Sequence, residues 1–201
     1  CKEKDSEKNT TENSSTSKCS KYDRDEYKHW VDSDGDCQDT RVEVLVSENT
    51  GTITFQTSNS CKVISGSWYD PFTNTTFTEA SSLDVDHMVP LKEAHESGAY
   101  LWSASKKQDY ANDLSSETSL IAVSSSANRS KGSRDPSEWL PTNTNYQNTY
   151  ASNWASIKVK WGLTADEEEI ASLKSILGSS ATLPLQAEEA ECTGSVDESI
   201  T

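Results

Sequence analysis

The chain has 201 residues, a length that suits one domain, or one domain with a tail, and is sufficient to enclose a hydrophobic core. Only 32% of the residues are hydrophobic, and no run approaches the roughly 18 consecutive apolar residues of a transmembrane helix. Lysine and arginine number 18 against 33 aspartates and glutamates, a net charge of −15. This charge excludes a protein that is basic over its whole surface, but it leaves room for a local basic site.

Composition divides the chain into three parts. Residues 1–20 contain no large apolar residue and are dominated by short polar and charged residues, which predicts a disordered polar tether. All six tryptophans lie from Trp30 to Trp161, so a folded domain is predicted over residues 21–182. Residues 183–201 carry several acidic residues and no lysine or arginine, which predicts an acidic tail tied back to the domain by Cys192.

The predicted elements describe a mixed α+β domain with strands early and central and helices late. Residues 41–47 are rich in valine and leucine, which favours a strand, although the run is short enough to be a helix. Residues 67–78 predict a hairpin, because aromatic residues flank a turn that contains proline and asparagine. Alternating apolar residues at 83–89 end at Pro90 and predict a strand.

Helices and one further strand follow. The short helices are predicted at 91–97, 105–114 and 124–131, with an apolar strand at 120–123. Aromatic residues recur at helical spacing between 146 and 161, which predicts a longer helix. The last helix is predicted to begin at a capping box, Thr164 to Glu167, and to bury Ile170, Leu173 and Leu177.

Among the three histidines, His87 is the candidate for chemistry. Residues 84–90 read DVDHMVP, so a carboxylate that suits Mg²⁺ or Mn²⁺ stands beside an imidazole able to take a proton from water. On a regular strand Asp86 and His87 face opposite ways, and a bend at the end of the strand would bring them together. The alternative is a surface Asp-His pair at a strand end. His29 and His95 are predicted to have structural roles, His95 as a helix cap.

The helix predicted at 124–131 supplies complementary groups. Its Asn128 offers a neutral oxygen ligand to a hard metal ion. Arg129 and Lys131, with the following Arg134, form a local basic patch in an otherwise acidic chain. Basic groups beside a hard-metal site suit a phosphate.

In combination these segments resemble the secreted HNH-family endonucleases of the ββα-metal superfamily. The matching segments are CQDTRVEVL (37–45), CKVISGSWY (61–69), DVDHMVP (84–90), LKEAHESGA (91–99), YANDL (110–114), LIAV (120–123), ANRSKG (127–132), DPSEWLP (135–141) and KVKWGL (158–163). The resemblance covers residues 22–177, and several independent motifs agree in order. It implies a ββα-metal core with a hairpin and additional C-terminal helices.

The resemblance also implies a mechanism. His87 would be the general base, and Asp86 and Asn128 would hold one Mg²⁺ or Mn²⁺ ion during hydrolysis of phosphodiester bonds in DNA, with RNA left open as a second substrate. The expected products carry a 5′-phosphate and a 3′-hydroxyl. Little sequence specificity is expected, because the remaining length holds no separate recognition domain. The protein is expected to act as a monomer.

Further residues receive roles from the same resemblance. Arg129 and Lys131 would meet the charge of the substrate phosphate. Arg41 would contact phosphate or, alternatively, form a structural salt bridge. Asn112 would shape a loop. His95 receives no role, because relatives often have tryptophan at its position.

The cysteines indicate an oxidising compartment. They are widely spaced, and no CxxC pair occurs among Cys1, Cys19, Cys37, Cys61 and Cys192. A Cys37–Cys61 disulfide is expected because both cysteines flank segments that match the family. Some relatives carry a further bridge that this chain lacks, and Cys19–Cys192, which would join the two ends of the domain, is predicted in its place. The expected localisation is therefore secreted or extracellular.

A bacterial surface lipoprotein is the form expected of this secreted protein. Cys1 followed by a polar tether resembles the lipidated start of such a protein, which would be its one link to a membrane. The alternative is that the chain merely begins at Cys1. Asn128-Arg129-Ser130 is also a glycosylation sequon, and a sugar there would block the metal ligand, which favours a bacterial source.

A calcium site is a further candidate. Asp32, Asp34 and Asp36 alternate as the ligands of a calcium loop do, although Gly35 does not stand where an EF-hand needs its glycine. The motif predicts either a structural Ca²⁺ site or a solvated acidic turn.

A second functional class is a non-catalytic surface lipoprotein that binds carbohydrate or peptide through exposed aromatic residues. Trp68, Tyr69 and Phe72 would suit stacking on a sugar, and packing within the hairpin would explain them equally well. This alternative leaves the combination of Asp86, His87 and Asn128 as coincidence.

Overall fold

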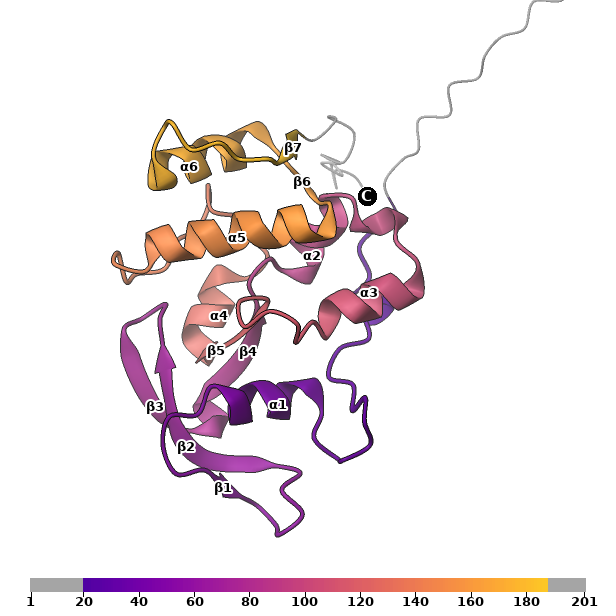
Figure 1. Ribbon diagram of the computed structural model, residues 1–201, viewed down its shortest axis with the longest axis vertical. Coiled ribbons are helices and arrows are strands. Elements are labelled where there is room, and N and C mark those ends of the chain that lie inside the picture. The colour runs from indigo at the N-terminus through magenta and orange to yellow at the C-terminus, as the bar shows by residue number, and fades with distance from the viewer. Residues whose placement is uncertain (1–19, 188–201) are drawn as a thin grey trace, which may run out of the picture.

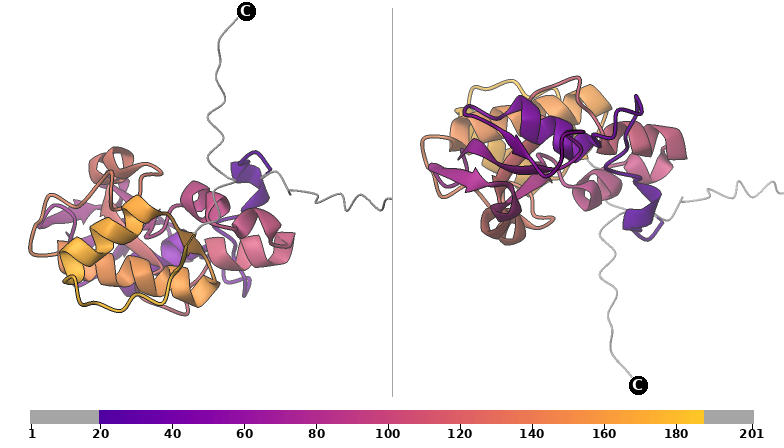
Figure 2. Two further views of the ribbon diagram at one scale, coloured as in Figure 1. Left: turned by 90° about the horizontal axis from the view of Figure 1, so that it is seen from above. Right: turned by 90° about the horizontal axis from the view of Figure 1, so that it is seen from below.

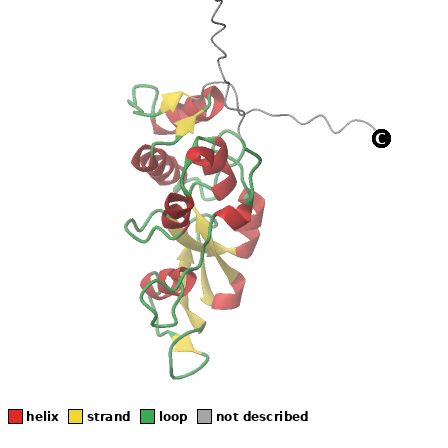
Figure 3. Ribbon diagram, turned by 90° about the vertical axis from the view of Figure 1, so that its right-hand side faces the viewer, coloured by secondary structure: helices red, strands yellow, loops and turns green. Residues whose placement is uncertain are grey.

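The computed structural model describes residues 20–187 (Figure 1, Figure 3). Its elements are η1 (Arg24–Glu26), α1 (Thr40–Ser47), β1 (Thr54–Phe55), β2 (Val63–Asp70), β3 (Thr75–Glu79), η2 (Ala80–Ser82), β4 (Leu83–His87), α2 (Leu91–Glu96), η3 (Ala99–Leu101), α3 (Ala104–Ala111), β5 (Leu120–Ser124), α4 (Ser125–Lys131), α5 (Gln147–Trp161), β6 (Thr164–Ala165), α6 (Glu167–Leu177) and β7 (Gln186–Ala187). The expectations for Cys1 and for the Cys19–Cys192 disulfide fall outside the described residues, as do the polar tether up to residue 19 and the acidic tail from residue 188.

The molecule is a mixed α+β structure, as predicted. Figure 1 shows the sheet β1–β2–β3 with α1 at one end, the two-stranded sheet β4–β5 with α4 in the middle, and α5 and α6 at the other end. The β4–β5 sheet lies between two hydrophobic cores. Val85 and Ala122 contribute to the core beside α1, whereas Ile121 and Val123 contribute to the core beside α5. The central unit therefore touches both cores.

The segment at 41–47, whose composition favours a strand, forms the helix α1. Asp39 caps its start, since its carboxylate accepts a hydrogen bond from Val42 N at 2.9 Å. Val42 and Leu45, three positions apart, are buried on one face of the helix against Trp68 and its neighbours. The N-cap and the packing of one helix face therefore outweigh the preference of valine for strands.

The β4–β5–α4 unit has the ββα order that the sequence resemblance predicts. The strands pair antiparallel from Leu83↔Ser124 to His87↔Leu120 without a register shift. The expected bend at the end of β4 is therefore absent from the strand. Side chains consequently alternate along β4, and Asp86 and His87 face opposite ways.

The outer edge of β5 is closed by two carboxylates. Ala122 N donates to Glu48 Oε2 at 3.1 Å, and Ser124 N donates to Asp70 Oδ2 at 3.1 Å. These backbone amides point away from β4, so the carboxylates satisfy donors that a neighbouring strand would otherwise take.

The last helix, α6, begins later than predicted. Asp166 rather than Thr164 is the N-cap, and its carboxylate accepts from Glu169 N at 2.7 Å. Thr164 instead pairs with β7 in the short parallel ladder. Leu173 is fully buried, as predicted, whereas Ile170 and Leu177 are only half-buried.

The predicted disulfide between Cys37 and Cys61 is confirmed, with the two Cα atoms 5.2 Å apart. It joins the loop before α1 to the connection between β1 and β2. Within residues 20–187, helices fall short of the length and apolar character needed to cross a membrane.

Candidate functional site

His87 ends β4 and is held in one orientation. Its Nε2 lies 2.9 Å from the carbonyl oxygen of Ala111, the last residue of α3. A carbonyl can only accept, so Nε2 carries the proton and Nδ1 keeps its lone pair. Burial lowers the pKa of His87 to about 3, so the imidazole is neutral at neutral pH. A neutral imidazole with a free Nδ1 is the form that accepts a proton.

The opposite face of β4 carries Asp84, the first residue of the DVDHMVP motif, for which no role is predicted from the sequence. Asn128 on α4 donates from Nδ2 to Asp84 Oδ2 at 3.0 Å, and Ser125 donates to Asp84 Oδ1 at 2.9 Å. The structure therefore places Asn128 against Asp84, whereas the expected partner was Asp86. Strand alternation indicates Asp84 as a second candidate carboxylate, because residues 84 and 86 share one face of β4.

Asp86 and Lys131 form a buried ion pair. Lys131 Nζ lies 2.5 Å from Asp86 Oδ2 and 2.7 Å from the carbonyl oxygen of His87. Lys131 is 0% exposed and Asp86 is 5% exposed. The expectation that Lys131 binds substrate phosphate is therefore wrong, because its ammonium group is enclosed and already paired. Burial raises the pKa of Asp86 and lowers that of Lys131, while their mutual attraction opposes both changes.

The other predicted cations have different surroundings. Arg129 is exposed on α4, two positions before the buried Lys131. Arg41 is half-buried, and its guanidinium donates to the carbonyl oxygens of Leu83 at 3.1 Å and Ala80 at 3.4 Å. Arg41 thus supports the start of β4 through backbone carbonyls, which differs from both the phosphate contact and the salt bridge considered for it.

Asn112 holds the N-terminal segment beside α3. Its Oδ1 accepts from Val31 N at 3.0 Å and from the Thr40 hydroxyl at 2.9 Å. Its Nδ2 donates to the carbonyl oxygens of Lys28 at 2.6 Å and Gln108 at 2.8 Å. The side chain joins two distant stretches of chain, which agrees with the loop-shaping role proposed for it.

The remaining histidines make local contacts. His95 is 1% exposed, with Nε2 2.9 Å from the carbonyl oxygen of Ser20 and Nδ1 3.0 Å from the Tyr27 hydroxyl. His29 Nδ1 lies 2.9 Å from the carbonyl oxygen of Tyr27. The prediction that His95 caps its helix is therefore wrong, because its buried ring instead joins α2 to the N-terminal segment. His29 packs against Trp30 with ring centroids 5.3 Å apart, in keeping with a structural role.

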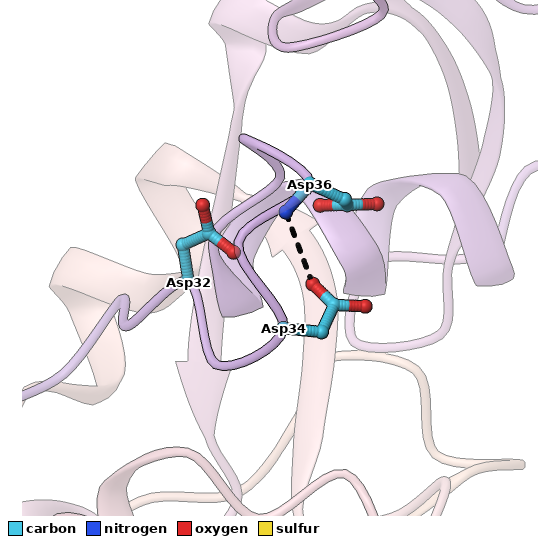
Figure 4. Close-up of side chains that lie close together, drawn as sticks. All are labelled: Asp32, Asp34 and Asp36. Carbon is cyan, nitrogen blue, oxygen red and sulfur yellow. Dashed lines mark hydrogen bonds between the residues drawn. The ribbon is translucent and has the colours of Figure 1, made fainter.

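The acidic loop at residues 32–36 gathers its three carboxylates around one turn (Figure 4). One oxygen from each of Asp32, Asp34 and Asp36 lies within 4.8 Å of the others, and all three residues are exposed. The same carboxylates accept from backbone amides of the loop, such as Gly35 N to Asp32 at 2.8 Å and Gln38 N to Asp36 at 2.7 Å. The carboxylate cluster suits the predicted Ca²⁺ site and the backbone bonds suit the predicted acidic turn, so both predictions stand.

The aromatic residues considered for sugar stacking are mostly internal. Trp68 and Phe72 are 0% exposed, and the indole N–H of Trp68 donates to the carbonyl oxygen of Leu45 at 2.7 Å. Tyr69 alone of these three is exposed. The interpretation of all three as an exposed stacking surface is therefore wrong, because two of them belong to the core.

The ββα unit therefore carries an oriented histidine on one face of its first strand and carboxylate and amide oxygens on the other. Sequence comparison gives the class of protein to which it belongs. The family of the C-terminal domain of GmrSD restriction endonucleases matches residues 39–175. The chain belongs to this family, an HNH-like nuclease group.

The chain is also similar to an individual secreted protein from a fungus. The chain is 40% identical over 156 residues to an "Uncharacterized secreted protein" of Arthroderma benhamiae, covering 78% of this chain and 74% of the relative. No solved structure matches the chain significantly. The relative is named as secreted and comes from a fungus, so the comparison gives no support to a bacterial lipid anchor.

Proposed function

We propose that this protein is a secreted, metal-dependent endonuclease that hydrolyses phosphodiester bonds of DNA with little sequence specificity. The observation that carries the proposal is the orientation of His87, whose Nε2 is engaged by the Ala111 carbonyl so that Nδ1 is the proton acceptor. Membership of an endonuclease family and the secreted relative support the substrate class and the location.

The donor set on the α4 side of β4 suits a hard divalent ion. Asp84 and Asn128 are in contact, and Asp86 lies on the same face of the strand. All three offer oxygen ligands, which Mg²⁺ and Mn²⁺ prefer. These residues would hold the ion, with Asp86 sharing its carboxylate with Lys131. When bound, the ion would neutralise charge on the phosphate and on the leaving 3′ oxygen.

Proton transfer, control of the imidazole tautomer and attraction of the substrate are assigned to residues of the protein. His87 Nδ1 would take a proton from the attacking water, which adds to phosphorus while the bond from phosphorus to the 3′ oxygen breaks. Because His87 faces away from Asp84, Asp86 and Asn128 on a regular strand, the substrate phosphate would have to reach both groups at the end of β4, where His87 is the last residue. The Ala111 carbonyl keeps the imidazole in the required tautomer. Arg129, exposed on α4, is the cation proposed to attract the substrate backbone.

Three variants test this division. His87→Ala should stay folded and keep its Mn²⁺ affinity, yet lose 10²–10⁴-fold in plasmid nicking rate, because no excess of metal replaces a base. Asp84→Ala and Asn128→Ala should bind Mn²⁺ more weakly and recover part of their activity at high Mn²⁺, since mass action offsets a lost ligand. EDTA should abolish nicking by the parent.

His95→Ala is the matched control, and its rate per folded molecule should equal that of the parent. A folded His87→Ala variant that nicks DNA at the parental rate would refute the proposed base. Parental nicking in EDTA would refute the metal requirement.

A further inference from the structure

The imidazole of His87 has two aromatic neighbours. Trp30 stacks on it with ring centroids 5.6 Å apart and planes inclined by 23°, and the Tyr110 ring is nearly parallel to it at a centroid distance of 6.5 Å and an angle of 18°. The hydrogen bond to Ala111 fixes one edge of the imidazole. The ring is therefore held at one edge and covered by the indole of Trp30, and His87 is only 8% exposed.

Trp30 is kept in place by its neighbours along the chain. Its φ of 61° lies in the left-handed region, which a bulky residue adopts only where the surroundings enforce it. Asn112 provides that enforcement from both sides, since it bonds Lys28 O and Val31 N. The hydrogen bond from Thr40 N to the Val31 carbonyl at 3.1 Å adds a further anchor.

The end of α3 contacts one edge of the His87 imidazole and holds the segment that covers one of its faces. Ala111 accepts from the imidazole, and the adjacent Asn112 holds the segment that carries Trp30. In both views of Figure 2 the indigo N-terminal segment runs beside α3. Trp30 precedes residue 39, where the match to the family begins, so this contact is an addition to the matched region.

We infer that Trp30 is a positioning residue that holds His87 for proton transfer, an inference that rests on the proposed nuclease function. Without the indole, one face of the imidazole opens, and its ring can rotate away from the Ala111 carbonyl. Proton transfer requires near-attack geometry, and a displacement of about 1 Å can cost about 10²-fold in rate. The segment that carries Trp30, which precedes the region matched by the family, therefore contributes to the candidate active site.

The test compares Trp30→Ala, Trp30→Leu and Trp30→Phe, with Trp139→Ala as the control for loss of a half-buried tryptophan. Trp139 packs on Phe72 and Tyr150, away from His87. At saturating Mn²⁺ on a short DNA duplex, Trp30→Ala and Trp30→Leu should lose roughly 10–100-fold in kcat with little change in KM. Trp30→Phe should restore most of the rate, because a flat ring again covers the imidazole.

Nuclear magnetic resonance of the histidine rings supplies a readout that does not depend on cleavage. In the parent, the His87 ring should show one tautomer with the proton on Nε2, and Trp30→Ala and Trp30→Leu should mix the two tautomers while Trp139→Ala does not. A folded Trp30→Leu variant with parental kcat and one His87 tautomer would overturn the inference, even if Trp30→Ala fails to fold. In that case an inactive His87→Ala variant leaves the proposed function standing, whereas an active one refutes the function itself.

Discussion

Lys131 and Arg129 lie two positions apart on α4 and have opposite surroundings. Lys131 is three positions after Asn128, so both point toward β4, whereas Arg129 points to solvent. Helical spacing therefore distinguishes the two cations in the sequence, although their chemistry suggests one shared role. The buried lysine compensates the charge of Asp86, and the exposed arginine is available to a partner.

Replacing Lys131 tests this distinction. Lys131→Met should lower the free energy of unfolding by about 3–5 kcal/mol, because it leaves the Asp86 carboxylate buried without a partner. Arg129→Met should change stability by less than about 0.5 kcal/mol. Urea denaturation measures both, and the double variant Asp86→Asn with Lys131→Met should regain much of the loss. An unaltered stability in Lys131→Met would contradict the ion pair.

Glu48 gives the protein a pH-dependent stability. Burial and the nearby charge of Glu117 raise the pKa of Glu48 to about 7, although its hydrogen bond from Ala122 N lowers it. In the unfolded chain the value is about 4.3. Between these pH values the folded protein keeps a proton that the unfolded chain has lost. Stability should therefore fall, by up to about 1.4 kcal/mol per pH unit, as the pH rises from about 4.5 to 7.

Glu48→Gln isolates this effect, because glutamine still offers an oxygen to Ala122 N and does not ionise. The variant should be more stable than the parent at pH 8, and the difference should shrink to nearly zero at pH 4. Melting temperatures across this range measure it. The control Glu117→Gln removes an exposed charge and should shift the profile only slightly. Parallel profiles for parent and Glu48→Gln would count against the raised pKa.

Part of the site was accessible from the sequence. The motif around His87 and the helix bearing Asn128 were identified because each is a contiguous pattern. The contact between Asn128 and Asp84 depends on how far α4 slides along β4, which no local pattern specifies. Trp30 gave no signal, since its neighbour His87 is 57 positions away and a tryptophan ordinarily suggests core packing.

The disulfide Cys37–Cys61 constrains the connection between the acidic loop and the small sheet. A bridge across a separation of 24 residues should stabilise the domain by about 2–4 kcal/mol, in large part by restricting the unfolded chain. The double variant Cys37→Ser, Cys61→Ser should lose this amount in urea denaturation. A loss below about 1 kcal/mol would show that the bridge adds little.

The same variant tests the predicted Cys19–Cys192 pair. Adding a reducing agent to the double variant should lower its stability further, because the second bridge would close a long loop of the unfolded chain. Peptide mapping without reduction should recover Cys19 joined to Cys192. No further change on reduction would contradict that pairing.

Element boundaries show where local patterns suffice. The strand around His87, the short β5 and the long helix α5 were predicted because their apolar periodicity is long or their ends are marked by proline and glycine. Residues 41–47 were ambiguous, since valine favours strands only weakly and the N-cap Asp39 decides locally. Thr164 was mistaken for a cap because Asp166, two residues later, offers the same chemistry.

The net charge of −15 should govern how the whole molecule meets DNA. At low ionic strength the acidic protein and the polyanion repel each other, which opposes attraction by exposed cations such as Arg129. Raising salt to about 0.1 M shortens the Debye length to about 10 Å and screens the repulsion. The kcat/KM for DNA cleavage should therefore rise before it falls with salt. A steady decline from the lowest salt would show that local attraction dominates throughout.

At the scale of the molecule, the closed edge of β5 affects more than folding stability. A two-stranded sheet offers unpaired amides to any extended segment that approaches, and such edges promote fibril growth. An incoming strand would have to displace Glu48 from Ala122 N and Asp70 from Ser124 N. Asp70 is fully buried and is also held by bonds from Phe72 N and the Thr73 hydroxyl, so its carboxylate cannot easily move aside. The sheet that carries the candidate base is thereby protected against templating aggregates.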